Sequence, residues 1–176
     1  MSFLKQPITY GAIALMSLIS LSCTEFEQAQ QPATTPPPPS TTPTVSEVNR
    51  LLSTKECSRC DLSGQNLVEA DLEDAILTEA DLSNAILSDA DLENANLTGA
   101  NLSGANLQDA DLDNAILNNT DLSEANLQAA SLEGVDLTQV NLTKTNLREA
   151  NIDDANLAEA EFDETIMPDG IIRNLE

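Results

Sequence analysis

The sequence predicts an all-β fold in which the chain coils around an axis filled by leucine side chains. From Leu62 to Phe162 every fifth residue is large and apolar, 21 positions in all, and 19 of them are Leu. The residue two places earlier is Ala in 15 of the 21 repeats, and the residue between is Asp or Asn in 16. A repeat of this regularity has to be explained before any other feature, because it determines the architecture.

A period of five fits neither a straight helix nor a straight strand. An α-helix turns about 100° per residue, so residues five apart spiral around it and form no stripe. Side chains of a strand alternate between two faces, so an odd spacing sends successive leucines to opposite faces. We therefore expect short extended pieces, each with its Ala and Leu inward, joined by bends that recur every five residues. A chain that bends the same way at each repeat forms a coil.

The residue after each Leu indicates how many repeats make one coil. Read every twenty residues, this position gives one series of Ser63, Ser83, Ser103, Ser123 and Thr143, and another of Glu73, Glu93, Asp113, Glu133 and Asp153. A period of twenty predicts four repeats per coil and a four-sided tube, whereas duplication of a twenty-residue unit without structural meaning is the alternative. With a strand spacing of roughly 4.8 Å, about five coils would make a rod roughly 25 Å long.

The repeats resemble the pentapeptide-repeat family, whose motif is A(D/N)LXX. ADLSN at 80–84 and ANLTG at 95–99 match it directly, and the resemblance extends from Cys60 to about Glu164. It implies a right-handed quadrilateral parallel β-helix with the Leu and Ala positions inside. Family members are especially abundant in cyanobacteria, and some mimic DNA and bind type II topoisomerases. The Ala position departs from the motif at six residues, Cys60, Gln65, Thr120, Val135, Val140 and Thr145.

The first 43 residues predict export. Residues 1–22 resemble a signal peptide, because Lys5 precedes an apolar stretch too short for a membrane span. Ser22-Cys23 resembles a bacterial lipobox, which would place a lipid on Cys23; the alternatives are ordinary cleavage, an uncleaved anchor, and no export. Residues 23–43 contain six Pro and are expected to form a disordered tether. We expect a membrane-anchored protein of the periplasm, or of the thylakoid lumen in a cyanobacterium, with a secreted soluble protein as the alternative.

Both ends of the coil need caps, since they would otherwise expose leucine and unpaired backbone. Residues 44–59 are expected to supply the N-terminal cap, because the segment 44–47 reads as a capping box that opens a short helix. Residues 60–167 would form the β-helix, and residues 168–176 a C-terminal cap after a turn at 168–170. The apolar residues expected to cover the two ends are Val45, Val48, Leu51 and Leu52 at the first, and Ile171, Ile172 and Leu175 at the second.

Cys57 and Cys60 form a C-x-x-C pair. In an oxidising compartment we expect a structural disulfide. The alternatives are reduced thiols with Cys60 packed inward, and redox or metal chemistry. A redox pair usually accompanies a βαβ pattern, which is missing here. A zinc site would need further ligands, but the chain has no His and only Cys23 besides. We therefore expect no metal and no cofactor.

The acidic residues are concentrated in the repeats. The net charge is −23, and 24 of the 30 acidic residues lie between Asp61 and Glu164 together with only two bases, Lys144 and Arg148. Nucleic-acid binding is excluded on this ground, because phosphate contacts need Lys and Arg. On a four-sided coil, one side would carry ten acids and no base. The candidate docking face consists of Asp71, Glu73, Asp91, Glu93, Asp111, Asp113, Glu133 and Asp153, accompanied by Asp74 and Asp154.

This side has three interpretations. It is a solvated surface whose short acids bond local backbone at the bends, a docking face for a basic protein partner, or a divalent-cation site. An enzyme is not expected, since without His the common Ser–His and Cys–His arrangements are impossible. We expect a non-enzymatic exported module that binds an unidentified protein and reaches the membrane through a lipid or signal anchor. A DNA-mimicking binder of a type II topoisomerase is the alternative, and cation binding is a second.

Overall fold

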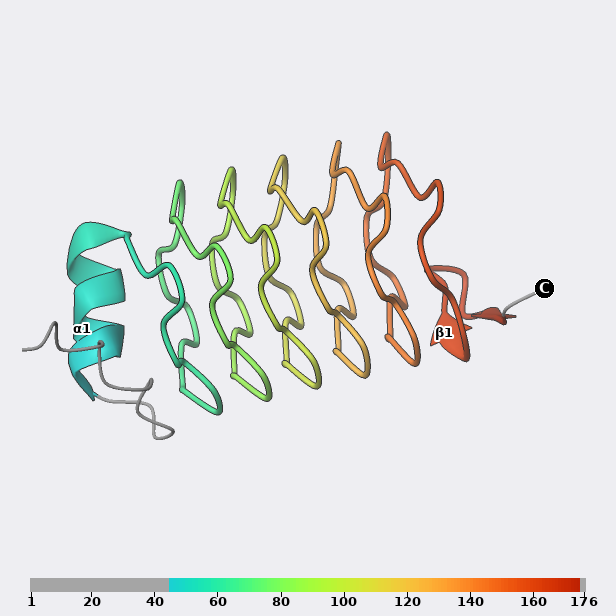
Figure 1. The fold of residues 1–176 in the computed structure, drawn as a ribbon. Coiled ribbons are helices and arrows are strands. Elements are labelled where there is room, and N and C mark those ends of the chain that lie inside the picture. The colour runs from blue at the N-terminus through green and yellow to red at the C-terminus, as the bar shows by residue number, and fades with distance from the viewer. Residues whose placement is uncertain (1–44, 175–176) are drawn as a thin grey trace, which may run out of the picture. The chain divides into compact units, whose positions relative to one another are not determined.

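The protein is described by a computed structural model that covers residues 45–174, all within one compact unit of the chain, Pro37–Glu176. Helix α1 (Val45–Thr54) is followed by a long parallel coil, and strands β1 (Thr165–Ile166) and β2 (Ile172–Arg173) lie at its far end (Figure 1). The signal peptide, Cys23 and the tether lie outside the described residues, as do Thr44 and Leu175.

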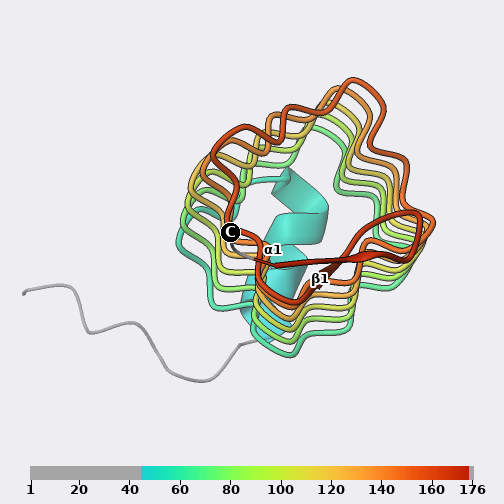
Figure 2. The ribbon, with the colours of Figure 1, turned by 90° about the vertical axis from the view of Figure 1, so that its right-hand side faces the viewer.

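The ladder of the coil has a period of twenty residues. Asp61 pairs in parallel with Asp81, which pairs with Asn101, and the same step recurs on every side up to the pair Asn146 and Ile166. Four pentapeptides therefore make one coil, which confirms the interpretation of the residues after Leu. Seen along the axis, successive coils follow one four-sided outline (Figure 2).

Each corner of the coil is a β-turn that follows a Leu. In one repeat Ala75 donates its N–H to the Leu72 carbonyl at 3.0 Å, and Asp74 has φ of 58°. A positive φ at the third residue is what a type II turn requires, and Gly, Asn and Asp adopt it most readily. These three residue types fill 12 of the 21 positions two places after the Leu. The variable part of the pentapeptide is thus selected by the turn.

Leucine and alanine fill the axis, as the repeat predicts. The leucines at every fifth position from Leu72 to Leu147 are all fully buried. Burying one Leu contributes about 1.5–3 kcal/mol. Three threonines replace Ala inside the coil, and each hydroxyl donates to a Leu carbonyl 23 residues earlier. The pairs are Thr120 to Leu97 (2.8 Å), Thr145 to Leu122 (2.7 Å) and Thr165 to Leu142 (2.5 Å). In the described part of the chain no buried side-chain N or O atom lacks a hydrogen-bond partner.

The coil begins at Glu56, four residues before the predicted boundary at Cys60. Glu56 pairs with Ile76, so Cys57 occupies a Leu position and Cys60 the next Ala position. The leucine pattern does not mark this first unit, because Cys57 stands at its Leu position. Its inward side chain serves the same purpose, since Cys57 is fully buried.

Helix α1 packs on the N-terminal end of the coil (Figure 1). Leu51 is fully buried and Val48 half-buried against the core, whereas Leu52 is 47% exposed. The expected burial of Leu52 was therefore wrong. Adjacent helical residues point about 100° apart, so Leu51 and Leu52 cannot both face the coil.

The C-terminal end is less completely covered. The turn at 168–170 is present, and β2 runs back antiparallel to β1 with Ile172 opposite Ile166. Ile171 and Ile172, however, are 64% and 57% exposed, which corrects their expected role as a cover. The guanidinium of Arg173 instead lies 4.1 Å from the centre of the Phe162 ring. An arginine over an aromatic face is a favourable contact that also shields the ring from water.

Candidate docking site on the acidic side

The structure brings the predicted acids together on one side of the coil. Asp71, Asp91 and Asp111 are successive members of a single ladder that continues to Ser131 and Asn151. We call this surface the acidic side and define it as residues 71–74, 91–94, 111–114, 131–134 and 151–154. All ten acids identified in the sequence lie on these segments.

In Asp91 and Asp111, one carboxylate oxygen accepts a backbone hydrogen bond from the turn that follows. Asp91 accepts the N–H of Glu93 at 3.1 Å, and Asp111 accepts the N–H of Asp113 at 3.0 Å. Asp113 has a second kind of contact, because it accepts the Ser131 hydroxyl and the Glu133 N–H from the next coil at 2.5 and 2.9 Å. These acids shape the coil, and the exposed acids beside them are free to meet a ligand: Glu73, Asp74, Glu133, Asp153 and Asp154.

Glu93 reports the electrostatic repulsion on this side. Its pKa is raised, first by partial burial and then by the negative charges of Glu73, Asp111, Asp91 and Asp113. Four acids from three coils thus act on one carboxyl group. The field at the centre of the acidic side therefore favours a proton, or any other positive charge, at Glu93.

One base that the repeat pattern did not reveal lies at the edge of the acidic side. The Nζ of Lys55 binds the Asp71 carboxylate and lies 2.6 Å from the Asp71 carbonyl oxygen. This contact lowers the pKa of Asp71. Lys55 precedes the first recognised repeat, so its position at the edge of the acidic side became visible only with the coil. The expectation of a side without any base is corrected accordingly.

The other bases of the coil also stand near its ends. Arg59 pairs with Glu79 of the next coil through two contacts of 2.7 and 3.1 Å, and Lys144 lies 3.9 Å from Glu124. Between Cys60 and Thr143 the sequence contains 17 acids and neither Lys nor Arg. The middle of the acidic side therefore has no basic neighbour to neutralise it.

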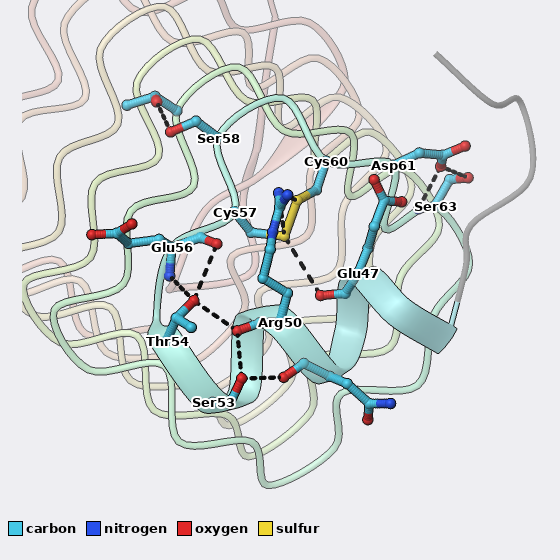
Figure 3. Close-up of a disulfide and its surroundings, with 12 residues drawn as sticks. Glu47, Arg50, Ser53, Thr54, Glu56, Cys57, Ser58, Cys60, Asp61 and Ser63 are labelled. Atoms are coloured by element: carbon cyan, nitrogen blue, oxygen red, sulfur yellow. Dashed lines mark hydrogen bonds between the residues drawn. A yellow bond between two sulfur atoms is a disulfide. The ribbon is translucent and has the colours of Figure 1, made fainter. Parts of the chain in front are cut away.

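The Cys57–Cys60 pair lies apart from the acidic side, at the N-terminal end of the coil. The two residues are joined by a disulfide with a Cα–Cα distance of 5.3 Å. Helix α1 lies over it, with the Glu47 carbonyl 3.6 Å from the Cys57 sulfur and the Arg50 guanidinium against both sulfurs (Figure 3). The contact with Arg50 was not predictable, because it depends on how the helix docks.

Among residues 45–174, no three side chains of the Cys, Asp or Glu type gather closely enough to hold a metal ion. Helix α1 has ten residues, and the described residues include no helix long and apolar enough to cross a membrane.

Comparison with known families decides the classification. The pattern of the family described as pentapeptide repeats matches residues 56–94, 90–128, 105–143 and 130–167, including the early start at Glu56. The chain belongs to this family. Its relatives imply that the coil is a right-handed quadrilateral β-helix. Pentapeptide-repeat proteins are generally structural or interaction modules that bind protein partners.

Several solved structures are similar. The pentapeptide-repeat protein Rfr23 from the cyanobacterium Cyanothece 51142 is 32% identical, with a TM-score of 0.66, and the match covers 68% of this chain and 95% of Rfr23. A pentapeptide-repeat protein from the Arabidopsis thaliana thylakoid lumen is 34% identical over 55% of this chain and 72% of its own, with a TM-score of 0.46.

A third similar structure is QnrB1, a plasmid-mediated fluoroquinolone resistance protein. It is 19% identical, with a TM-score of 0.59, and the match covers 64% of this chain and 60% of QnrB1. This likeness concerns the fold alone. The comparison with curated proteins gave no match.

Proposed function

We propose that this pentapeptide-repeat protein is a non-enzymatic interaction module whose acidic side docks a basic segment of a protein partner. The observation that supports the proposal most directly is the stack of Asp71, Asp91 and Asp111 in one ladder, with the raised pKa of Glu93 beside it. Surfaces of one charge sign increase the local concentration of oppositely charged partners and speed their association.

Lys55 shows the contact that a partner's lysine would make. Its ammonium group reaches both the carboxylate and the backbone carbonyl of Asp71. The carboxylate recurs along the ladder at Asp91 and Asp111, one coil apart each time, whereas the carbonyls of these two residues already accept the N–H of Leu72 and Leu92 at 2.7 Å. A segment with several Lys or Arg residues could therefore repeat the ion pair of Lys55, without its contact to the carbonyl, along the axis.

The proposal is tested by removing charge from the acidic side and, in a matched control, from the neighbouring side. Asp113 is left unchanged because it bonds to the next coil. The acidic-side variant carries Glu73→Gln, Glu93→Gln, Glu133→Gln and Asp153→Asn. The control variant carries Glu69→Gln, Asp89→Asn, Asp109→Asn and Glu149→Gln, so both lose four charges.

Binding to a fluorescent oligolysine peptide is then measured by anisotropy at two salt concentrations. We expect the acidic-side variant to bind at least about tenfold more weakly than the control at low salt, since a close ion pair at the protein surface is worth about 1 kcal/mol or more. The difference should shrink at high salt. Equally weakened oligolysine binding in the two variants would show that only net charge matters and would contradict a docking site on the acidic side.

We further propose that the protein is exported and held at a membrane by a lipid on Cys23. The apolar stretch before Ser22-Cys23 and the Pro-rich segment after it support this proposal. In cell fractionation the native chain should be found with membranes, and Cys23→Ser should move it to the soluble fraction. A native chain that stays in the cytosol with residues 1–22 retained would reverse the proposal.

Cytosolic retention would favour the DNA-mimicking alternative, because type II topoisomerases act in the cytoplasm. The net charge of −23 suits that alternative, whereas the likeness to QnrB1 contributes only the fold. Cation binding by the acidic side predicts a higher Tm in millimolar calcium than in sodium of matched ionic strength. The same Tm in both salts would leave the protein partner as the ligand of this side.

A further inference from the structure

The Cys57–Cys60 disulfide closes a turn that the rest of the coil makes without a covalent link. Cys60 donates its N–H to the Cys57 carbonyl at 3.3 Å, just as Ala75 donates to the Leu72 carbonyl at 3.0 Å. Leu and Ala occupy the two positions in most other repeats. The turn itself therefore does not require the disulfide, and the surroundings of the two sulfurs have to indicate what it does.

Arg50 is the charged group at the disulfide. Its Nη2 lies 3.6 Å from the Cys57 sulfur and closer to the Cys60 sulfur (Figure 3). Arg50 belongs to none of the three ion pairs found among the described residues. A disulfide sulfur is neutral and a weak acceptor, so it gives the guanidinium little in return. A cysteine thiolate in the same place would be a full anionic partner. The site thus fits the reduced pair better than the oxidised one.

Helix α1 covers the two sulfurs. Cys57 and Cys60 are 0% and 2% exposed, and Arg50, which contacts both sulfurs, lines a surface hollow of about 340 Å³. The other lining residues are Thr54, Glu56 and Ser58. The helix is ten residues long, and its apolar contact with the core includes Leu51 and Val48. Elements at the end of a fold open locally at a lower free energy than the core, so α1 can admit a small reductant.

We propose that Cys57 and Cys60 form a thiol–disulfide exchange site for a dithiol reductant, with Arg50 as the positioning residue that stabilises the Cys60 thiolate. A thiolate of the dithiol attacks the Cys57 sulfur, the S–S bond breaks, and Cys60 leaves as a thiolate facing Arg50. The second thiol of the reductant, after losing its proton, attacks the mixed disulfide and releases Cys57, which takes up a proton. The dithiol is oxidised to a disulfide by two electrons, and the protein pair is reduced by the same two electrons.

The test compares Arg50→Gln with Arg59→Gln. Both variants remove a positive charge within ten residues of the cysteines, but Arg59 pairs with Glu79 instead of the sulfurs. Each protein is equilibrated at pH 8 with reduced and oxidised dithiothreitol in varying ratio, quenched with acid and alkylated. Mass spectrometry gives the reduced fraction, and circular dichroism checks that the coil stays folded.

We expect Arg50→Gln to require at least about a tenfold higher ratio of reduced to oxidised dithiothreitol for half reduction, because a charge-assisted contact to the thiolate is lost. Arg59→Gln and the charge-conserving Arg50→Lys should stay close to the native protein. If Arg50 only held the helix in place, its loss would loosen α1 and shift the equilibrium toward reduction. An unchanged ratio, a shift of that opposite sign, or a native disulfide that is reduced only when the coil unfolds would overturn the proposal.

Discussion

At the scale of single residues, the interior of the coil accepts a polar group only where a carbonyl is available to it. Thr145 stands at an Ala position and is fully buried, and its hydroxyl donates to the Leu122 carbonyl at 2.7 Å. That carbonyl also accepts the N–H of Ala125 at 3.0 Å. The turn therefore still satisfies the carbonyl when the hydroxyl is removed.

Thr145→Val should consequently lower the free energy of unfolding by about 1 kcal/mol, the usual net worth of one internal hydrogen bond. The matched control is Thr143→Val, two residues away on the outside, which should change stability by less than about 0.5 kcal/mol. Urea unfolding followed by circular dichroism measures both. Equal effects of the two substitutions would mean that the buried hydroxyl contributes nothing specific.

The carboxyl group of Glu93 makes the stability of the coil depend on pH. Because its pKa is raised in the folded protein, the folded state holds more protons than the unfolded state just above the ordinary value of 4.5. Stability therefore falls as pH rises through this interval, and the ionised group destabilises the coil at neutral pH. The carboxyl group is only partly buried, so the effect is small and screened by salt.

Glu93→Gln should therefore raise the Tm at pH 7 and low salt, and the gain over the native protein should disappear as pH is lowered through 4.5. Glu69→Gln on the neighbouring side serves as the control for losing one negative charge, and it should raise the Tm less. Scanning calorimetry at pH 7 and at a pH below 4.5 measures the Tm of the native protein and of both variants. A Tm gain from Glu93→Gln that is the same at both pH values would contradict the assignment.

At the scale of elements, the helix and the coil differ in how far the sequence determines them. The five-residue spacing of Leu predicted the coil, and the residues after Leu predicted that one complete coil takes twenty residues. Both features could be predicted because they follow from local geometry that repeats. Leu51 and Leu52 could not be told apart in this way, since the face of a helix that packs depends on the element it meets. The contact of Arg50 with the disulfide and that of Lys55 with Asp71 were missed for the same reason.

The difference between Leu51 and Leu52 gives a direct test of the cap. Leu51→Ala should lower the free energy of unfolding by about 2–4 kcal/mol, because it empties a fully buried site. It should also speed reduction of the Cys57–Cys60 disulfide by dithiothreitol. Leu52→Ala, one residue further and 47% exposed, should do neither to a comparable extent. Identical reduction rates in the two variants would contradict a cap that shields the sulfurs.

At the scale of the whole described unit, a neutral core and a charged exterior are produced by the same pentapeptide. The Leu and Ala positions hold no charged residue, so the outside positions alone decide which side carries charge. A coil of four repeats brings residues twenty apart into one ladder and so collects the acids on one side. An insertion of one, two or three whole pentapeptides rotates the sides beyond it and disperses the acids, while leaving leucine inside.

The most direct test of this account inserts the uncharged sequence NLSGA after Ala105, either once or four times. One copy turns the following coils by a quarter of the circumference and splits the acidic side, whereas four copies add a complete coil and restore its alignment. Both proteins keep the charge of the parent, and both should fold. We expect oligolysine affinity, measured by anisotropy at low salt, to fall several-fold with one copy and to stay near the parent value with four. Equal affinities for the two insertions would contradict a docking site formed by one side of a four-repeat coil.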